Sequence, residues 1–179
     1  MFVTRLATIA DIPFLQNLIA SSVRGLSEGY YSPTQIESSI KYIFGIDTQL
    51  LVDKTYYVIE CENVIVACGG WSKRATLYGG DQHKEIADPL LDPKTDAARI
   101  RAFFVDPAWA RRGIGKMMIN HCENEAMKNG FTAMELGATL PGEPLYKAMG
   151  YTSISSVNAN MPDGEILEVI KMRKELVVK

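Results

Sequence analysis

The sequence has few of the residues that would support a disulfide framework or a metal site. Its 179 residues include three cysteines and two histidines. The number of cysteines is odd and no pair has C-x-x-C spacing, which favours reduced thiols over disulfides or a zinc site. Neither histidine has a cysteine or carboxylate at a recognisable metal-ligand spacing. We therefore expect no metal.

The sequence also lacks a long hydrophobic run and an excess of charge of either sign. No apolar run approaches the roughly 20 residues of a membrane helix. The first residues have neither the basic nor the continuous apolar region of a signal peptide. The 19 basic and 21 acidic residues nearly cancel, and the pI is about 5.7, which disfavours a dedicated nucleic-acid binder. The sequence predicts a cytoplasmic protein whose partners include neither a membrane nor a nucleic acid.

The composition is that of one ordinary globular domain. Hydrophobic residues make up 47% of the chain and charged residues 22%, and the mean hydropathy is -0.02. A domain of this size buries about 70% of its unfolded surface, so it needs no metal or disulfide to form a core. No repeat or linker divides the chain. We expect a single domain over residues 1–179 that is an enzyme or a small-molecule binder.

Hydrophobic periodicity and capping residues predict a mixed α/β fold with the order β-α-α-β-β-β-α-β-α-β-β. Helices are expected at 12–23, 33–45, 113–129 and 143–149. Strands are expected at 2–6, 55–59, 64–68, 99–105, 131–136, 151–157 and 166–172. Gly25 is expected to begin a connector, and Gly69-Gly70 to end a strand. Residues 71–96 show no period and predict a long loop, which is usually functional or mobile.

The most informative segment is FFVDPAWARRGIGK, at residues 103–116. It predicts a strand, a proline-marked turn and a glycine-rich start of a helix. The first N–H groups of a helix have no internal partner, and the helix dipole adds partial positive charge there. Glycines let an anion approach the backbone, and Arg111, Arg112 and Lys116 add positive charge. The segment therefore predicts a cradle for a phosphate or pyrophosphate.

Two common phosphate-binding motifs fit this segment poorly. A P-loop requires Ser or Thr after its lysine, whereas Met117 follows Lys116. A Rossmann fingerprint requires a third glycine, whereas Met118 stands three residues after Gly115. That fingerprint also opens a parallel βαβ unit, and here a helix pair and a hairpin come first.

The sequence resembles the GCN5-related N-acetyltransferase family. The resemblance rests on FFVDPAWARRGIGKMM, on the later segment ATLPGEPLYKAMGY, and on the order of the elements. It implies a mixed, mostly antiparallel sheet flanked by helices, with acetyl-CoA as cosubstrate. The pyrophosphate would lie on the backbone amides of Arg111, Arg112, Gly113, Ile114, Gly115 and Lys116. The pantetheine would run along the exposed backbone of Phe103, Phe104 and Val105, where the strand splays from its neighbour.

Two positions depart from the family pattern. Ala110 stands where the family often has Gln or Arg, and Pro141 stands where it often has Asn five residues before the tyrosine. The arginines at 111 and 112 can supply the missing charge. A hydrogen bond from a side chain to the cosubstrate is expected to be missing at Pro141.

The resemblance places Tyr146 near the sulfur of the cosubstrate, where it would protonate the departing thiolate. An ordinary core aromatic is the alternative interpretation. The 99–105 strand has no carboxylate to deprotonate the acceptor amine, so Glu135 on the following strand is the candidate base, and an ordinary surface glutamate is its alternative. Packing or surface roles are expected for His83, His121, Cys122, Trp71 and Trp109. The alternatives are that His83 faces a substrate and that the two tryptophans line an acceptor cleft.

The resemblance implies that Tyr30, Tyr31 and the 71–96 loop form walls of the acceptor site. The loop carries Asp81, Glu85, Asp88, Asp92 and Asp96, a slight acidic excess that fits either a cationic amine or a solvated surface. The predicted function is direct transfer of acetyl to a primary amine, on a small molecule or a peptide. A non-catalytic acyl-CoA sensor and a plain interaction domain are the alternatives, and a homodimer remains open.

Overall fold

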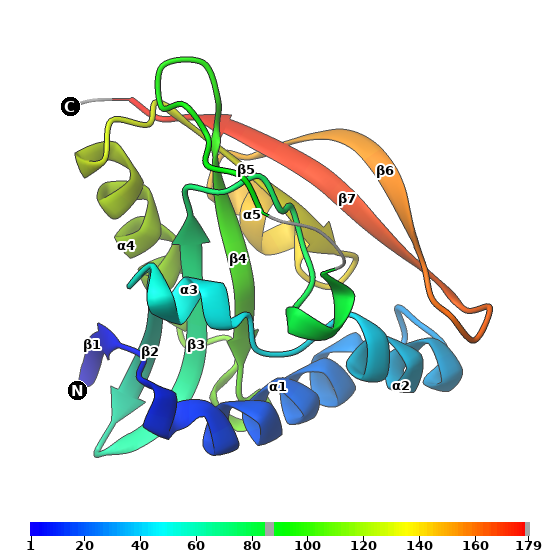
Figure 1. Ribbon diagram of the computed structural model, residues 1–179. Coiled ribbons are helices and arrows are strands. Elements are labelled where there is room, and N and C mark those ends of the chain that lie inside the picture. The colour runs from blue at the N-terminus through cyan, green and yellow to red at the C-terminus, as the bar shows by residue number, and fades with distance from the viewer. Residues whose placement is uncertain (85–87, 178–179) are drawn as a thin grey trace.

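The computed structural model describes residues 1–84 and 88–177, which form a mixed α/β domain on one seven-stranded sheet (Figure 1). The strand order is β1-β2-β3-β4-β5-β7-β6, and only β4 and β5 pair in parallel. The strands are β1 (Phe2–Leu6), β2 (Tyr56–Cys61), β3 (Val64–Ser72), β4 (Ala98–Val105), β5 (Ala133–Thr139), β6 (Thr152–Asn160) and β7 (Ile166–Glu175). The helices are α1 (Ile12–Ser27), α2 (Pro33–Tyr42), α3 (Thr48–Val52), α4 (Ile114–Lys128) and α5 (Glu143–Ala148), with 3-10 turns η1 (Ile9–Asp11), η2 (Asp81–His83) and η3 (Pro107–Trp109).

The order of elements predicted from the sequence is confirmed, with one addition. The short helix α3 was not expected, because five residues are too few to show an apolar period. Its start is fixed locally: the carboxylate of Asp47 accepts a hydrogen bond from the amide of Gln49 at 3.1 Å. Part of the region between α2 and β2 is therefore helical.

Three glycines expected to end elements lie inside them. Gly25 belongs to α1, where a Cβ atom would come within 2.5 Å of Pro107 Cγ. Gly69 and Gly70 belong to β3, which continues to Ser72. A Cβ at Gly69 would meet the ring of Phe103, and one at Gly70 would meet the backbone of β2. These glycines permit close packing, so the prediction that they end elements was wrong.

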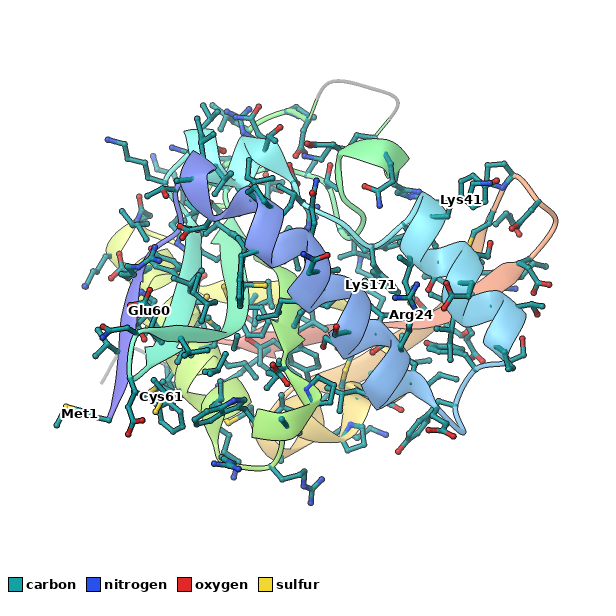
Figure 2. All side chains as sticks on the ribbon, turned by 90° about the horizontal axis from the view of Figure 1, so that it is seen from below. Met1, Arg24, Lys41, Glu60, Cys61 and Lys171 are labelled. Atoms are coloured by element: carbon teal, nitrogen blue, oxygen red, sulfur yellow. The ribbon has the colours of Figure 1, made fainter. Side chains whose placement is uncertain are left out.

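Helices cover both faces of the sheet. On one face α4 packs over residues of β3, β4 and β5, including Ile100, Met134 and Leu136. On the other face α1 and α2 cover a second core that includes Val58 and Phe104. Figure 2 shows α1, which carries the labelled Arg24, lying across the sheet beside α2. Each face thus has its own hydrophobic core.

The parallel pair β4 and β5 separates soon after it begins. Only Ala98 with Met134 and Arg99 with Glu135 are in register. Beyond these two rungs the strands diverge, while β4 continues its pairing with β3 and β5 continues its pairing with β7. The facing edges after Arg99 and Glu135 are left without a neighbouring strand. Backbone N–H and C=O groups on such edges need other partners.

Candidate functional site

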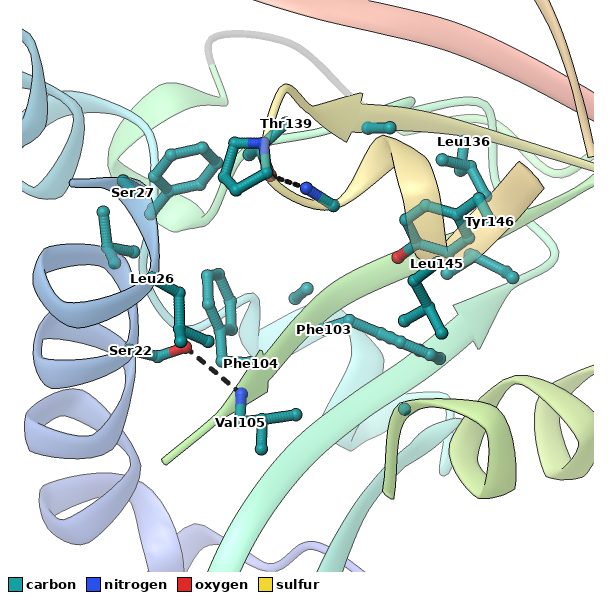
Figure 3. A pocket seen from close by; sticks show the side chains of 18 of the residues that line it. Ser22, Leu26, Ser27, Phe103, Phe104, Val105, Leu136, Thr139, Leu145 and Tyr146 are labelled. Carbon is teal, nitrogen blue, oxygen red and sulfur yellow. Dashed lines mark hydrogen bonds between the residues drawn. The ribbon is translucent and has the colours of Figure 1, made fainter. Parts of the chain in front are cut away.

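A cavity of about 810 Å³ occupies the gap between the diverging strands (Figure 3). Its walls are the facing edges of β4 and β5, the loop before α4, the first turn of α4, the helix α5, the second half of α1 and residues 43–45 and 77–80. Segments far apart in the sequence thus meet at the one place where the sheet is open.

The cavity reaches both faces of the sheet. Consecutive side chains of a strand point to opposite faces. Phe103 accordingly packs with the core under α4, and Phe104 with the core under α1 and α2. Both phenylalanines line the cavity, so it passes through the sheet between β4 and β5. We call its two ends the α4 end and the α1 end.

The α4 end contains the loop and the helix start for which the sequence predicts a backbone cradle. Arg111 and Gly113 have φ angles of 65° and 82°, which turn the loop sharply before α4 begins at Ile114. The first backbone bond of the helix runs from the amide of Met117 to the carbonyl of Gly113, at 3.0 Å. The three amides before Met117 therefore have no partner within the helix, and the residues from Gly113 to Lys116 line the cavity.

The charged side chains divide between the cavity and the surface. Arg111 and Lys116 line the cavity and are its only charged lining residues among residues 1–84 and 88–177. Arg112 is not among the lining residues: its guanidinium lies 4.7 Å from the ring centre of Trp109 and donates to the carbonyl of Ala108 at 3.3 Å. The side chain of Arg112, which was expected to add positive charge to the cradle, thus packs over Trp109 outside the cavity lining.

The edge of β4 carries a bulge beside the cavity. Its register with β3 shifts between Cys68 and Gly70, and Ala102 has a φ of 52°. The hydroxyl of Tyr56 donates to the carbonyl of Ala102 at 2.9 Å and supports this strained conformation. Bulges of this kind redirect backbone groups, and this one changes the direction of the β4 edge that faces the gap.

One amide on this edge has a side-chain partner. The N–H of Val105 donates to the hydroxyl of Ser22 on α1 at 3.2 Å, as Figure 3 shows. Ser22 is buried and lines the cavity. Its hydroxyl therefore satisfies a donor that any ligand lying along β4 would meet. This contact could not be predicted from the sequence, because it joins residues 83 positions apart.

Tyr146 lies on α5 and is buried, yet its hydroxyl points into the cavity (Figure 3). The ring packs against Phe103 and Tyr151, with ring centres 6.5 and 5.7 Å away. Burial raises the pKa of the Tyr146 hydroxyl above its ordinary value. The phenol therefore keeps its proton at neutral pH and can donate a hydrogen bond inside the cavity.

The sequence model of the acetyltransferase (GNAT) family matches residues 21–151. That segment contains most of the cavity wall, including the cradle and Tyr146. The chain belongs to this family. A search of curated protein sequences finds no match.

Solved structures confirm the GNAT fold over nearly the whole chain. A GCN5-related N-acetyltransferase from Rhodopseudomonas palustris is 17% identical, with a TM-score of 0.74 over 97% of this chain and 95% of that one. The PaiA N-acetyltransferase of Thermoplasma acidophilum, solved with coenzyme A, is 16% identical, with a TM-score of 0.64 over 98% and 99%. YncA of Salmonella typhimurium, solved with acetyl-CoA, is 14% identical, with a TM-score of 0.64 over 99% and 95%.

Glu135 does not fit the role of base in this GNAT domain. It is buried but lies outside the cavity lining, and its carboxylate is 2.9 Å from Arg99, 3.1 Å from Arg173 and 3.4 Å from Lys171. Burial raises the pKa of Glu135, but the bond from Arg173 and the nearby cations outweigh it and lower the pKa. A carboxylate held ionised by three cations is a weak proton acceptor.

The two tyrosines expected to form an acceptor wall have different positions. Tyr30 is half exposed and lines the cavity. Tyr31 does not line it: its hydroxyl donates to the carbonyl of Glu168 at 2.7 Å and accepts from the amide of Leu140 at 2.8 Å. Burial raises the pKa of Tyr31 to about 12. Tyr31 therefore joins the connector between α1 and α2 to β7 and to the loop after β5.

The remaining candidates pack as expected, with one exception. Trp71 and Cys122 are buried in the core under α4, and His121 lies edge-on to Tyr57 with ring centres 4.3 Å apart. Burial lowers the pKa of His121, which keeps the imidazole neutral. The exception is Trp109, which lines the cavity beside the cradle.

Part of the long loop between β3 and β4 is fixed to the sheet. Arg101 on β4 is buried, and its guanidinium donates to Asp47 at 2.9 Å, to the carbonyl of Gly79 at 2.6 Å and to the carbonyl of Thr76 at 3.3 Å. Lys84 adds a second ion pair to Asp47, at 2.6 Å. These contacts set the position of residues 77–80, which form a wall of the α1 end.

Residues 1–84 and 88–177 contain neither a candidate membrane span nor a candidate metal site. No helix there is long and apolar enough to cross a membrane. No group of three or more histidine, cysteine, aspartate or glutamate side chains there is arranged to hold a metal ion. Glu85, one of the acidic loop residues noted in the sequence, lies outside the described part of the chain.

Proposed function

We propose that the chain transfers acetyl from acetyl-CoA directly to a primary amine. The observation that carries this proposal is the continuous path from the cradle at α4, along the unpaired edge of β4, to the hydroxyl of Tyr146. The structures of PaiA and YncA, which hold coenzyme A and acetyl-CoA, support the choice of cosubstrate.

The residues at the α4 end fit a pyrophosphate. A Cβ atom added at Gly113 would meet nothing within 4 Å, so an anion can approach this backbone without obstruction. The free amides of Ile114, Gly115 and Lys116 would donate to its oxygens, and the side chains of Arg111 and Lys116 would balance its charge. Gly115 allows α5 to approach, because its Cβ would lie 2.7 Å from Leu145 Cδ2.

The residues at the strand gap fit the pantetheine arm and the reacting thioester. Unpaired backbone groups of β4 and β5 would bind the amides of the arm as an added strand does. A backbone amide of β4 would polarise the thioester carbonyl. The amine nitrogen then bonds to the carbonyl carbon, the carbon–sulfur bond breaks, and Tyr146 gives its proton to the leaving thiolate. The proton lost by the nitrogen passes to water, and the Tyr146 phenolate takes a proton back from water.

Two assays test this proposal and its alternatives. In a thermal melt, acetyl-CoA at about 100 times its Kd should add roughly 2.7 kcal/mol, a rise of about 5–10 °C, whereas NADH and ATP should not. Release of free thiol that depends on an amine would establish transfer. Stabilisation by acetyl-CoA without amine-dependent thiol release would instead support the sensor. No stabilisation at millimolar acetyl-CoA would refute both.

A further inference from the structure

The α1 end of the cavity is uncharged and rich in aromatic rings. Its lining side chains come from α1 and the connector after it, from the residues after α2, from the 77–80 segment and from one face of β4. The larger ones are Val23, Leu26, Tyr30, Ile43, Phe44, Leu77, Tyr78 and Phe104. Within residues 1–84 and 88–177, the charged side chains of the lining are confined to the α4 end, at Arg111 and Lys116.

The rings of this end are packed into fixed positions. Phe44 lies edge-on to Phe104, with ring centres 5.9 Å apart. Tyr78 stacks on His83 at 5.2 Å and lies so close to β5 that a Cβ at Gly137 would be 3.2 Å from its ring. The α1 end therefore offers rigid apolar surface to a ligand, with the tyrosine hydroxyls, Ser22 and Ser27 as its polar side-chain groups.

Nearby acidic side chains are engaged elsewhere and do not line the cavity. Asp47 pairs with Arg101 and Lys84. Asp81 accepts from the amide of Thr48 at 3.0 Å. Asp88 accepts from the amide of Thr76 at 2.8 Å and lies 3.3 Å from Lys84. Among the described residues, the acidic side chains of this region thus maintain its fold, and they supply no counter-charge to a cationic acceptor.

This distribution of charge disfavours a strongly basic acceptor. An ammonium group at the α1 end would lose its hydration without gaining a carboxylate partner, which is costly. An amine like that of lysine is neutral in roughly one molecule in a thousand near pH 7.4, whereas an α-amine is neutral in about a quarter. In an arylamine the nitrogen lone pair is shared with the ring, so nearly all molecules are neutral at this pH. A free amino acid would also bring an unpaired carboxylate to this end.

We propose that the acceptor is a small primary amine that is largely uncharged at neutral pH and carries an aromatic ring or a comparable apolar group. This inference rests on the proposed function and specifies its substrate class. The neutral nitrogen attacks the thioester without a protein base, since its one surplus proton leaves to water after the carbon–nitrogen bond has formed. The described lining residues include no carboxylate or imidazole that could act as a base, and a neutral amine does not require one.

Four amines separate charge from shape in the thiol-release assay at pH 7.4. Aniline is neutral and aromatic, phenylalanine amide is aromatic with a weakly basic α-amine, benzylamine is aromatic but cationic, and spermidine is cationic without a ring. We expect kcat/KM to be highest for aniline or phenylalanine amide, at least tenfold lower for benzylamine and lowest for spermidine. Whether aniline or phenylalanine amide has the higher kcat/KM shows whether the acceptor nitrogen is that of an arylamine or that of an α-amine.

The pH dependence gives a second readout. For benzylamine, kcat/KM should rise about tenfold per pH unit while the ammonium form predominates, because only the neutral form enters the cavity. For aniline it should be nearly constant over the same range. A flat profile for benzylamine, or a higher kcat/KM for spermidine than for aniline, would overturn the inference while leaving the transferase proposal intact. No turnover with any of the four amines, despite stabilisation by acetyl-CoA, would count against both.

A variant that adds a carboxylate tests the inference from within the chain. Leu26→Glu should raise kcat/KM for benzylamine relative to aniline by at least tenfold, because it supplies the missing partner for an ammonium. The control Val52→Glu adds the same charge on α3 at a side chain that is 74% exposed, and its ratio should stay unchanged. An acetyl-CoA melt shows that each variant is folded. An unchanged ratio in a folded Leu26→Glu protein would refute the assignment of this end to the acceptor.

Discussion

Replacing Gly113 with alanine tests the cradle at a single backbone position. Gly113 has a φ of 82°, lines the cavity and would hold a Cβ in space that is empty within 4 Å. Gly164, in the turn between β6 and β7, has a φ of 89° and an equally empty surrounding. It does not line the cavity. The two glycines thus make a matched pair that differs mainly in their distance from the proposed pyrophosphate.

The two alanine variants should lose similar stability but different affinity. A left-handed conformation costs a residue with a Cβ about 1–2 kcal/mol, which lowers the Tm of a domain of this length by about 2–8 °C. At Gly113 the added methyl also keeps an anion from the amides of α4. Losing one charge-assisted hydrogen bond costs about 1.5–3 kcal/mol, which raises the Kd for coenzyme A about 10- to 150-fold.

Titration calorimetry with coenzyme A, alongside thermal melts, measures both effects. We expect equal melting temperatures for Gly113→Ala and Gly164→Ala, and a weaker affinity only for the first. Pantetheine, which lacks the pyrophosphate, should bind both variants as it binds the parent protein. Equal affinities for coenzyme A in the two folded variants would show that the pyrophosphate does not lie on the amides of Ile114, Gly115 and Lys116.

Three further substitutions test individual side chains. Tyr146→Phe should lower kcat about 10²- to 10⁴-fold with little change in the Kd for acetyl-CoA, because only the proton donor is lost; an unchanged kcat would remove Tyr146 from the mechanism. Ser22→Ala should tighten acetyl-CoA binding about fivefold by freeing the amide of Val105, as a calorimetric titration would show, whereas weaker binding would make Ser22 a ligand contact. Glu135→Gln should leave the pH profile of kcat unchanged and lower the Tm at pH 7. The pKa of Glu135 is lowered in the folded state, so this stabilisation is present above the unfolded pKa, and the Tm difference should shrink and then vanish as the pH falls from the unfolded pKa through the lower folded pKa.

The sequence could predict the α4 end because its contacts are local. The strand, the turn and the first helical turn lie within residues 98–117, and each step has a chemical signal: the aromatic run, Asp106-Pro107 and the glycines. The sequence did not predict that the side chain of Arg112 packs over Trp109, because this contact depends on the path of the loop.

The α1 end could not be predicted residue by residue because its walls meet only through the tertiary fold. Phe44, Tyr78 and Leu26 belong to separate segments whose periodicity suggests core or loop positions and nothing more. The acidic loop residues pointed to a cationic acceptor as readily as to a solvated surface. Their partners, such as the amide of Thr48 for Asp81, depend on how the start of α3 and the long loop lie together in the fold.

Glu135 shows how the neighbours in a sheet decide the role of a side chain. The sequence correctly placed it on the strand after α4, but strand periodicity does not give the order β4-β5-β7. In that order Glu135 is in register with Arg99 on one side and Arg173 on the other, and it pairs with both. Arg99 and Glu135 form the last rung before β4 and β5 diverge. The buried ion pairs therefore hold β4 and β5 together at the point where the two strands begin to separate. The Glu135 carboxylate thus contributes to the cavity by stabilising the place where the gap starts.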